Sequence, residues 1–171
     1  MLYRNLGEDP ATDFVQRLEE LRPKFDGAGR MLLGIQHHDS TLSVLPYEGG
    51  EIPPEVTHIN TGLFHPDESG PWSERGGQCS HVMGLVLDDQ GTPDKAAVEP
   101  STEATARVWT SEGSEQWLYL YSEPVEPEAA LAMNNGAVLA ELSDGFIGMR
   151  FHHWWRIPDR LPEPKIRQGR T

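Results

Sequence analysis

The stretch EQWLYLYS, residues 115–122, decides how this chain folds. Side chains on a β-strand alternate between its two faces, so the stretch places three aromatic residues on one face and two leucines on the other. Because both faces are apolar, we expect this strand to be covered on both sides and to lie in the middle of a sheet. The aromatic face consists of Trp117, Tyr119 and Tyr121.

Pairs of turn-forming residues divide most of the remaining chain into short segments. They recur about every eleven residues, the interval expected for a strand plus a turn in an antiparallel sandwich or barrel. Alternating strands and crossover helices need longer segments. The sequence therefore predicts a mainly β fold, an antiparallel, meander-rich barrel or sandwich, over residues 29–157. The turn pairs include Gly49-Gly50, Gly76-Gly77 and Asn135-Gly136.

Residues 10–22 carry the pattern of an amphipathic helix. Asp9 can cap the amides of a helix that starts at Pro10. Apolar side chains then recur at helical spacing, and Pro23 ends the pattern. We therefore expect one N-terminal α-helix packed on the β body. Residues 128–133 also consist of helix formers, and the sequence leaves open whether they form a helical turn or part of a hairpin.

We expect a single domain over residues 1–171. A chain of this length with 37% hydrophobic residues can bury one core. The β body would be followed by an extended polar tail at residues 158–171, which is rich in proline. The segment from Pro53 to Gly77 lacks a clear period and is predicted to be a long loop.

The acidic composition bears on partners and location. There are 27 Asp and Glu against 14 Lys and Arg, a formal net charge of -13, so the average field repels phosphates and argues against nucleic acid. A basic protein surface, a cation or a neutral small molecule suits that field better. No apolar run approaches the roughly 18 residues needed to cross a bilayer, and the single cysteine, Cys79, is easiest to keep reduced in the cytoplasm. We expect a cytoplasmic protein without a membrane segment.

The last long apolar run, residues 146–157, carries a mixed aromatic and basic face. At a period of two it aligns Arg150, His152, Trp154 and Arg156. Trp154 could stack on a ligand, and the two arginines could hold a carboxylate.

The sequence leaves three interpretations of this face open. If it lines a barrel interior, it forms a pocket for a neutral or anionic small molecule, with Trp117, Tyr119 and Tyr121 as further walls. If it faces solvent, it is a protein-contact patch. In the third interpretation it is an ordinary outer face whose arginines pair with some of the acidic residues.

Histidine, aspartate and cysteine provide weak candidates for a metal site. Same-face pairs at a spacing of two are His37 with Asp39 and Cys79 with His81, and either pair could be joined around a divalent ion by His58 or His65 from the long loop. Neither paired CxxC motifs nor HExxH occurs, so we expect no metal and no other cofactor. A histidine could activate Cys79 as a nucleophile, but its position at the start of an apolar strand favours a small buried core residue. No catalytic residue can be identified.

These observations favour a binding protein over an enzyme. The first hypothesis is a non-catalytic acidic module that docks on a basic site of a partner protein, as inhibitors and immunity proteins do. The alternative is a small β-barrel that binds or converts a small molecule in an aromatic pocket, as a carrier, cyclase or isomerase. A homo-oligomer, as a subunit of a larger assembly, is a third possibility.

Overall fold

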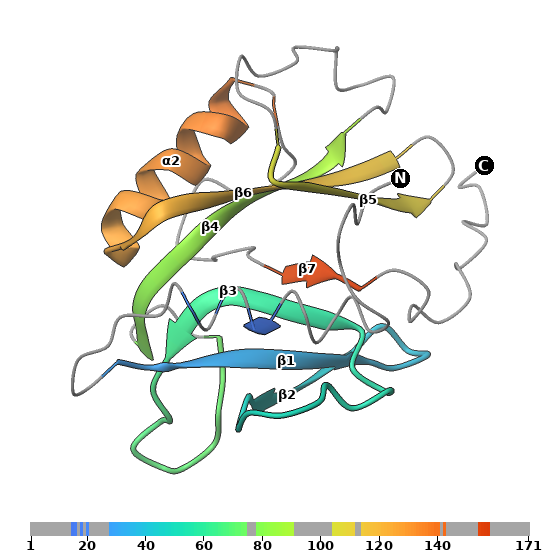
Figure 1. The fold of residues 1–171 in the computed structure, drawn as a ribbon, viewed down its shortest axis with the longest axis vertical. Helices are drawn as coiled ribbons and strands as arrows, with labels where there is room; N and C mark the ends of the chain where they lie inside the picture. The colour runs from blue at the N-terminus through green and yellow to red at the C-terminus, as the bar shows by residue number, and fades with distance from the viewer. Residues whose placement is uncertain are drawn as a thin grey trace.

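The computed structural model shows an antiparallel sheet with a helix packed on it (Figure 1). The predicted mainly β, antiparallel character is therefore confirmed. The structure describes residues 28–74, 78–90, 104–111, 114–140, 142 and 154–157, together with Val15, Gln16, Leu18 and Glu20. The strands are β1 (Arg30–Gln36), β2 (Leu42–Pro46), β3 (His58–Phe64), β4 (Cys79–Gln90), β5 (Ala106–Ser111), β6 (Ser114–Val125) and β7 (Trp154–Arg156), and the helix is α2 (Pro127–Leu139).

The sheet branches at β3, because two different strands pair with one edge of this strand. The described strands follow the order β2-β1-β3-β4-β6-β5. One edge of β3 pairs with β1, while the other edge pairs with β4 near Phe64 and with β7 near His58. Because the order begins at β2 and ends at β5, the described strands do not close into a ring. The predicted barrel is therefore not confirmed.

Strand β4 connects the lower and upper layers of the molecule in Figure 1. It pairs with β3 at its start and with β6 over most of its length, with a register shift at Gly84. Met83 and Val86 consequently both pack into the main core, whereas Leu87 lies in the cluster beneath α2. Met83 and Leu87 therefore lie on different faces although they are four residues apart, because the irregularity between Val82 and Gly84 moves the residues after it to the other face.

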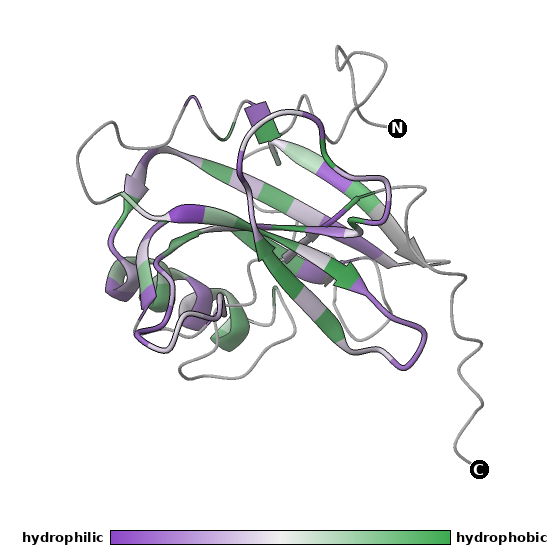
Figure 2. Ribbon diagram, turned by 90° about the horizontal axis from the view of Figure 1, so that it is seen from below, coloured by the Kyte–Doolittle hydropathy of each residue, from purple (hydrophilic) through white to green (hydrophobic). Residues whose placement is uncertain are grey.

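The main hydrophobic core lies between the two layers and draws side chains from most of the strands. Figure 2 shows apolar residues alternating with more polar ones along the strands, as a half-buried sheet requires. Burial of these side chains away from water is the main favourable contribution to folding. Core members include Met31, Leu33, Ile59, Leu63, Met83, Val108, Leu118 and Trp155.

Helix α2 covers the opposite face of β4 and β6. Its buried residues are Ala130, Asn134 and Ala137, and the small side chains of the two alanines let the helix approach the sheet closely. Trp117 of β6 packs in the cluster with Ala137, while the leucines of the same strand join the main core. The prediction that this strand is covered on both sides is confirmed.

The predicted N-terminal helix over residues 10–22 is not confirmed. The helix that the structure defines lies toward the C-terminus, where Pro127 at its first turn and the following helix formers favour it. Val15 and Leu18 are fully buried in the main core, so the apolar period identified buried residues without establishing a helix. Most of residues 10–22 and the predicted tail at 158–171 lie outside the described residues. No helix in the described part of the chain is long and apolar enough to span a membrane.

Candidate functional site

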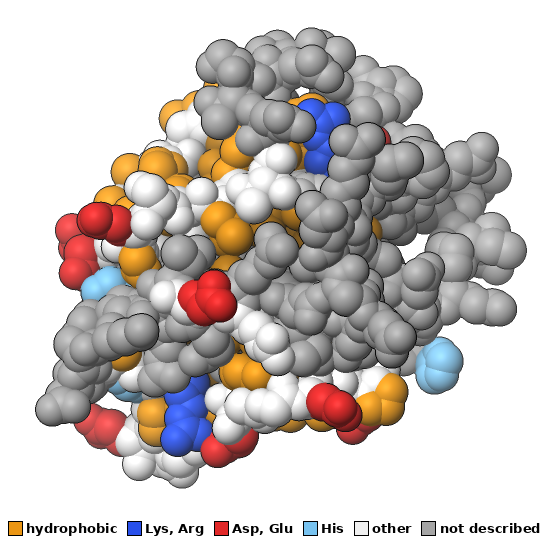
Figure 3. All heavy atoms as spheres, in the orientation of Figure 1, with side chains coloured by type: hydrophobic (Ala, Val, Ile, Leu, Met, Phe, Trp, Pro, Cys, Tyr) orange, Lys and Arg blue, Asp and Glu red, His pale blue; other side chains and the backbone are white. Residues whose placement is uncertain are grey.

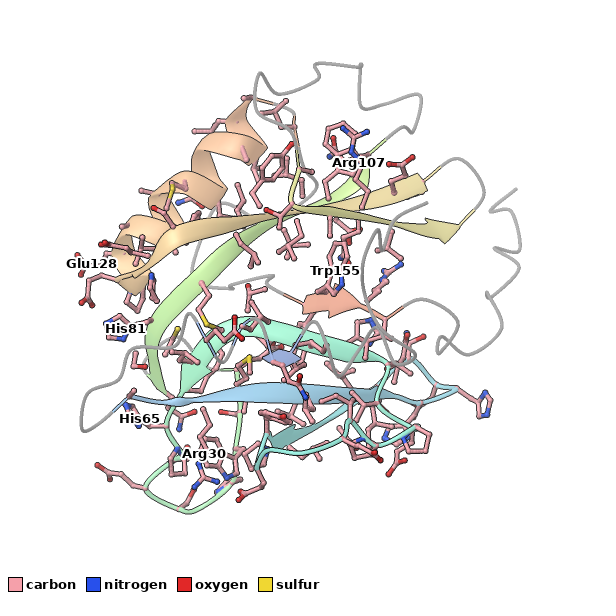
Figure 4. All side chains as sticks on the ribbon, in the orientation of Figure 1. Arg30, His65, His81, Arg107, Glu128 and Trp155 are labelled. Atoms are coloured by element: carbon pink, nitrogen blue, oxygen red, sulfur yellow. The ribbon has the colours of Figure 1, made fainter. Side chains whose placement is uncertain are left out.

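Four side chains form a square on one face of β3 and β7. The cross-strand register places His58 opposite Arg156 and Asn60 opposite Trp154. Residues directly opposite in an antiparallel pair share a face, with Cβ atoms about 4.5–5.5 Å apart. The residue that lies between the two members of the set on each strand points into the main core, as Trp155 of β7 does (Figure 4). The four residues, called here the β3–β7 square, therefore lie on the face away from the core.

The side chain of Gln116 on β6 holds β7 in place. Its Nε2 donates to the carbonyl oxygen of Trp154 at 3.0 Å, and its Oε1 accepts from the backbone N–H of Arg156 at 2.9 Å. These two bonds imitate the pattern that a neighbouring strand would provide, and Gln116 is only 3% exposed. Strand β7 is thus bound by β3 along one edge and by an amide side chain along the other.

His58 contributes a neutral ring to the square. It is 7% exposed, and its Nδ1 lies 2.8 Å from Oγ1 of Thr57, which also accepts from the backbone N–H of Gln36 at 2.8 Å. Burial, and secondly the charge of Arg156, lower the pKa of His58 from 6.5 to about 4. At neutral pH the square therefore carries the positive charge of Arg156 and none from the imidazole.

Asn60 contributes an amide whose hydrogen-bonding capacity is only partly used. The residue is 0% exposed, and its Oδ1 accepts from the backbone N–H of Gly62 at 2.7 Å, which fixes the orientation of the amide. The Nδ2 group is buried and has no hydrogen-bond partner. A buried donor left unpaired costs about 1–3 kcal/mol. A ligand oxygen that accepts a hydrogen bond from Nδ2 would remove this cost, and binding of the ligand would be favoured accordingly.

The indole of Trp154 extends across β3 as far as β1. A Cβ on Gly34 of β1 would lie 3.1 Å from Cζ3 of Trp154, so the missing side chain at Gly34 makes room for the ring. His58 meets the indole edge-on, with ring centroids 6.4 Å apart. Nε1 of Trp154 donates to Oε2 of Glu74, which follows β3 on the loop at 65–74. The indole consequently covers this face of β3 and is tethered by a carboxylate.

Arg156 differs from the other arginines in the described part of the chain. Arg30 forms an ion pair with Glu48, and the guanidinium of Arg107 stacks over Trp117 at 4.1 Å from the ring centroid. The partly buried guanidinium of Arg156 has no carboxylate partner among the described residues. It is therefore the described cation that could bind an anionic ligand.

The structure separates the residues that were predicted as one pocket. Trp154 and Arg156 share a face of β7, whereas Arg150 and His152 lie outside the described residues. The proposed further walls belong to the face of β6 that packs beneath α2, and Arg107 stacks over one of them, Trp117, in the upper layer of Figure 4. Those walls are Trp117, Tyr119 and Tyr121.

From the sequence, His58 is a candidate only as a further metal ligand on the predicted long loop, and neither Asn60 nor Gln116 is a candidate. The segment from Pro53 to Gly77 is predicted as a loop from its composition, but β3 lies inside it, and every residue of β3 is buried. The alternation of polar and apolar residues around Ile59 is a signal that could have indicated a strand. Gln116 carries no such signal, because its role depends on the distant strand β7.

The weak metal candidates on β1 are occupied with local hydrogen bonds. His37 Nε2 lies 2.7 Å from Oγ of Ser43, and Asp39 accepts from both the backbone and the hydroxyl of Thr41. The bonds from Thr41 lower the pKa of Asp39. Within the described ranges, no group of three or more His, Cys, Asp and Glu side chains gathers.

The candidates on β4 are similarly engaged in local contacts. The thiol of Cys79 lies 3.4 Å from the carbonyl oxygen of His81, and Nε2 of His81 lies 3.6 Å from Oε1 of Glu126. Burial raises the pKa of Cys79 to about 12. The thiolate that a nucleophile or metal ligand requires is therefore strongly disfavoured at neutral pH.

An acidic surface follows the loops on the β1–β2 side of the molecule. Residues 28–74 are described without a gap and contain seven acidic residues but one arginine, Arg30. Six of the seven acidic residues are exposed, and Figure 3 shows acidic side chains along the lower edge of the molecule. The seven are Asp39, Glu48, Glu51, Glu55, Asp67, Glu68 and Glu74.

Comparison with known proteins identifies no relative. No protein-family model, no curated protein and no solved structure matches the chain. Function therefore has to be inferred from the charges, contacts and burial of its own residues.

Proposed function

We propose that this protein is a binding module without chemistry of its own, which docks its acidic surface on a basic site of a partner protein. The observation that supports this is the charge of residues 28–74, where seven acidic residues accompany one arginine that is itself paired with Glu48. A surface of one sign accelerates association with a partner of opposite sign and disfavours other partners.

The distribution of the acidic residues suits a protein partner better than a metal ion. They are spread over the β1–β2 turn, the loop at 47–57 and the loop at 65–74. A metal ion needs ligands that converge, and no such group gathers in the described part of the chain. Dispersed carboxylates can instead meet several basic side chains of a second protein.

Strand β2 gives this surface an apolar centre. It lies at one end of the order of the described strands, where it pairs with β1, and Leu42 and Val44 on one of its faces are partly exposed, whereas Leu45 packs against the main core. An edge strand offers backbone hydrogen-bonding groups to a partner. An apolar centre with a charged rim is the common composition of a protein interface.

The test is affinity capture from the native host, followed by measurement with purified components. The full chain should retain a basic protein, and the dissociation constant of the reconstituted complex should rise steeply when the salt is raised from about 50 to about 300 mM. The triple variant Glu48→Gln, Glu51→Gln and Glu55→Gln removes three charges from the acidic surface. It should weaken the complex by at least about tenfold.

A matched variant controls for net charge. Glu123→Gln, Glu126→Gln and Glu128→Gln remove three exposed charges near the start of α2, away from the lower edge of the molecule (Figure 4). This variant should leave the complex within about twofold of the unchanged protein. Equal weakening by both triple variants, or the absence of any basic partner, would refute docking through the acidic surface.

A further inference from the structure

We propose that the β3–β7 square is a binding site for a singly charged carboxylate, a function separate from docking through the acidic surface. Two donor groups of the square support this assignment. The Nδ2 group of Asn60 is fully buried without an acceptor, and the guanidinium of Arg156 has no carboxylate partner among the described residues. Both groups donate hydrogen bonds, and neither accepts them at these atoms.

The two donors lie within reach of one ligand. Arg156 is directly opposite His58, and Asn60 is two residues further along the same face of β3. Diagonal neighbours in an antiparallel pair remain within reach of long side chains. The planar guanidinium matches the two oxygens of a carboxylate, and one of these oxygens could also accept from the Asn60 amide.

The charge of the site favours a monoanion. His58 is neutral at neutral pH because burial lowers its pKa to about 4, so it adds no positive charge. Glu74 brings a carboxylate to the rim, where it accepts from Nε1 of Trp154. A phosphate group, with close to two negative charges at neutral pH, would meet one arginine and one repelling carboxylate. A carboxylate brings a single charge.

Access to Asn60 depends on the indole of Trp154. The ring crosses β3 from β7 and reaches Gly34 on β1, while Glu74 holds its Nε1. Because Glu74 is exposed, the tether can be broken by water without disturbing the core. A ligand that enters beside Arg156 therefore displaces the indole toward solvent, and an aromatic carboxylate gains the ring as a stacking surface.

Titration of the full chain with sodium benzoate, followed by calorimetry, tests the site. We expect one molecule of benzoate to bind, with inorganic phosphate and the neutral analogue benzamide each weaker by at least about tenfold. Arg156→Gln should weaken benzoate binding by a similar factor. Arg107→Gln is the matched control and should leave binding unchanged, because Arg107 stacks on Trp117 in the upper layer.

Asn60→Asp supplies the sharpest test of the buried amide. Aspartate keeps the acceptor for the Gly62 N–H but replaces Nδ2 with a carboxylate oxygen within diagonal reach of Arg156. The variant should fold, as judged by its circular dichroism, and should lose benzoate binding because the arginine is then occupied internally. If Asn60→Asp does not fold, Arg156→Gln alone decides the question.

Glu74→Ala tests the role of the indole. Loss of the tether and of its negative charge should tighten benzoate binding severalfold, whereas Glu68→Ala on the same loop should not. The proposal is overturned if benzoate does not bind the unchanged protein, if benzamide or phosphate binds equally well, or if Arg156→Gln has no effect. Unchanged affinity in Glu74→Ala would overturn the role assigned to Trp154.

Discussion

The substitution Gln116→Leu should loosen β7 and lower the free energy of unfolding by about 3 kcal/mol. The amide of Gln116 satisfies the carbonyl group of Trp154 and the N–H of Arg156. Gln116 is 3% exposed, so water cannot replace the amide without opening the structure. Each unpaired buried group costs about 1–3 kcal/mol. Leucine is close to glutamine in volume, so the expected loss comes from the hydrogen bonds.

Chemical denaturation gives the global effect, and amide hydrogen exchange of Arg156 gives the local one. Both should change in Gln116→Leu, with faster exchange at Arg156 than at residues of β1. Gln116→Glu is the matched control, because its carboxylate still accepts from the Arg156 N–H but cannot donate to Trp154. It should protect the Arg156 amide better than leucine does. A loss of stability below about 0.5 kcal/mol in Gln116→Leu, with the Arg156 amide still protected, would refute the reasoning.

Two further predictions concern the backbone and the pH dependence of stability. A Cβ at Gly84 would lie 2.8 Å from the carbonyl oxygen of Tyr119, so Gly84→Ala should lower the free energy of unfolding by about 1–3 kcal/mol. Gly136 in α2 has open space around it, and Gly136→Ala should raise that free energy by about 0.5–1 kcal/mol; thermal unfolding measures both, and equal effects would contradict the described packing. The pKa of His58 falls from 6.5 in the unfolded chain to about 4 in the folded one. The unfolded chain therefore takes up a proton first as the pH falls, and stability should decline by about 3 kcal/mol between pH 6.5 and 4 and stay level above that window. His58→Gln should remove most of that dependence, and an undiminished slope in this variant would show that other groups cause it.

The parts of the fold that were predictable are those with a strong local pattern. Strand β6 alternates aromatic residues with leucines, and both faces are indeed buried. Strand β3 was missed because its short alternation around Ile59 lies inside a segment rich in proline, glycine and charged residues, whose composition is typical of a loop. Its stability comes from pairing with β1, β4 and β7, which are distant in sequence.

Only part of the β3–β7 square could be predicted from the sequence. Alternation correctly places Trp154 and Arg156 on one face of β7, because that relation depends on two residues of the same strand. It cannot reveal that His58 and Asn60 lie opposite them, since register between distant strands is set by the whole sheet. The sequence of β6 also does not show what packs on its aromatic face, because that contact is made by a separate element, α2.

Salt should separate the two proposed interactions. Docking of the acidic surface depends on exposed charges, whose attraction is screened beyond about 10 Å at 0.1 M salt, so the affinity of that complex should fall as salt increases. Binding of benzoate at the β3–β7 square is opposed by the net charge of -13 but favoured by a close contact with the partly buried Arg156. Salt screens the distant repulsion more than the close, partly buried contact. The affinity for benzoate should therefore stay constant or rise between about 50 and about 300 mM salt. A steep fall would mean that benzoate binds an exposed cation elsewhere on the surface and not the partly buried Arg156.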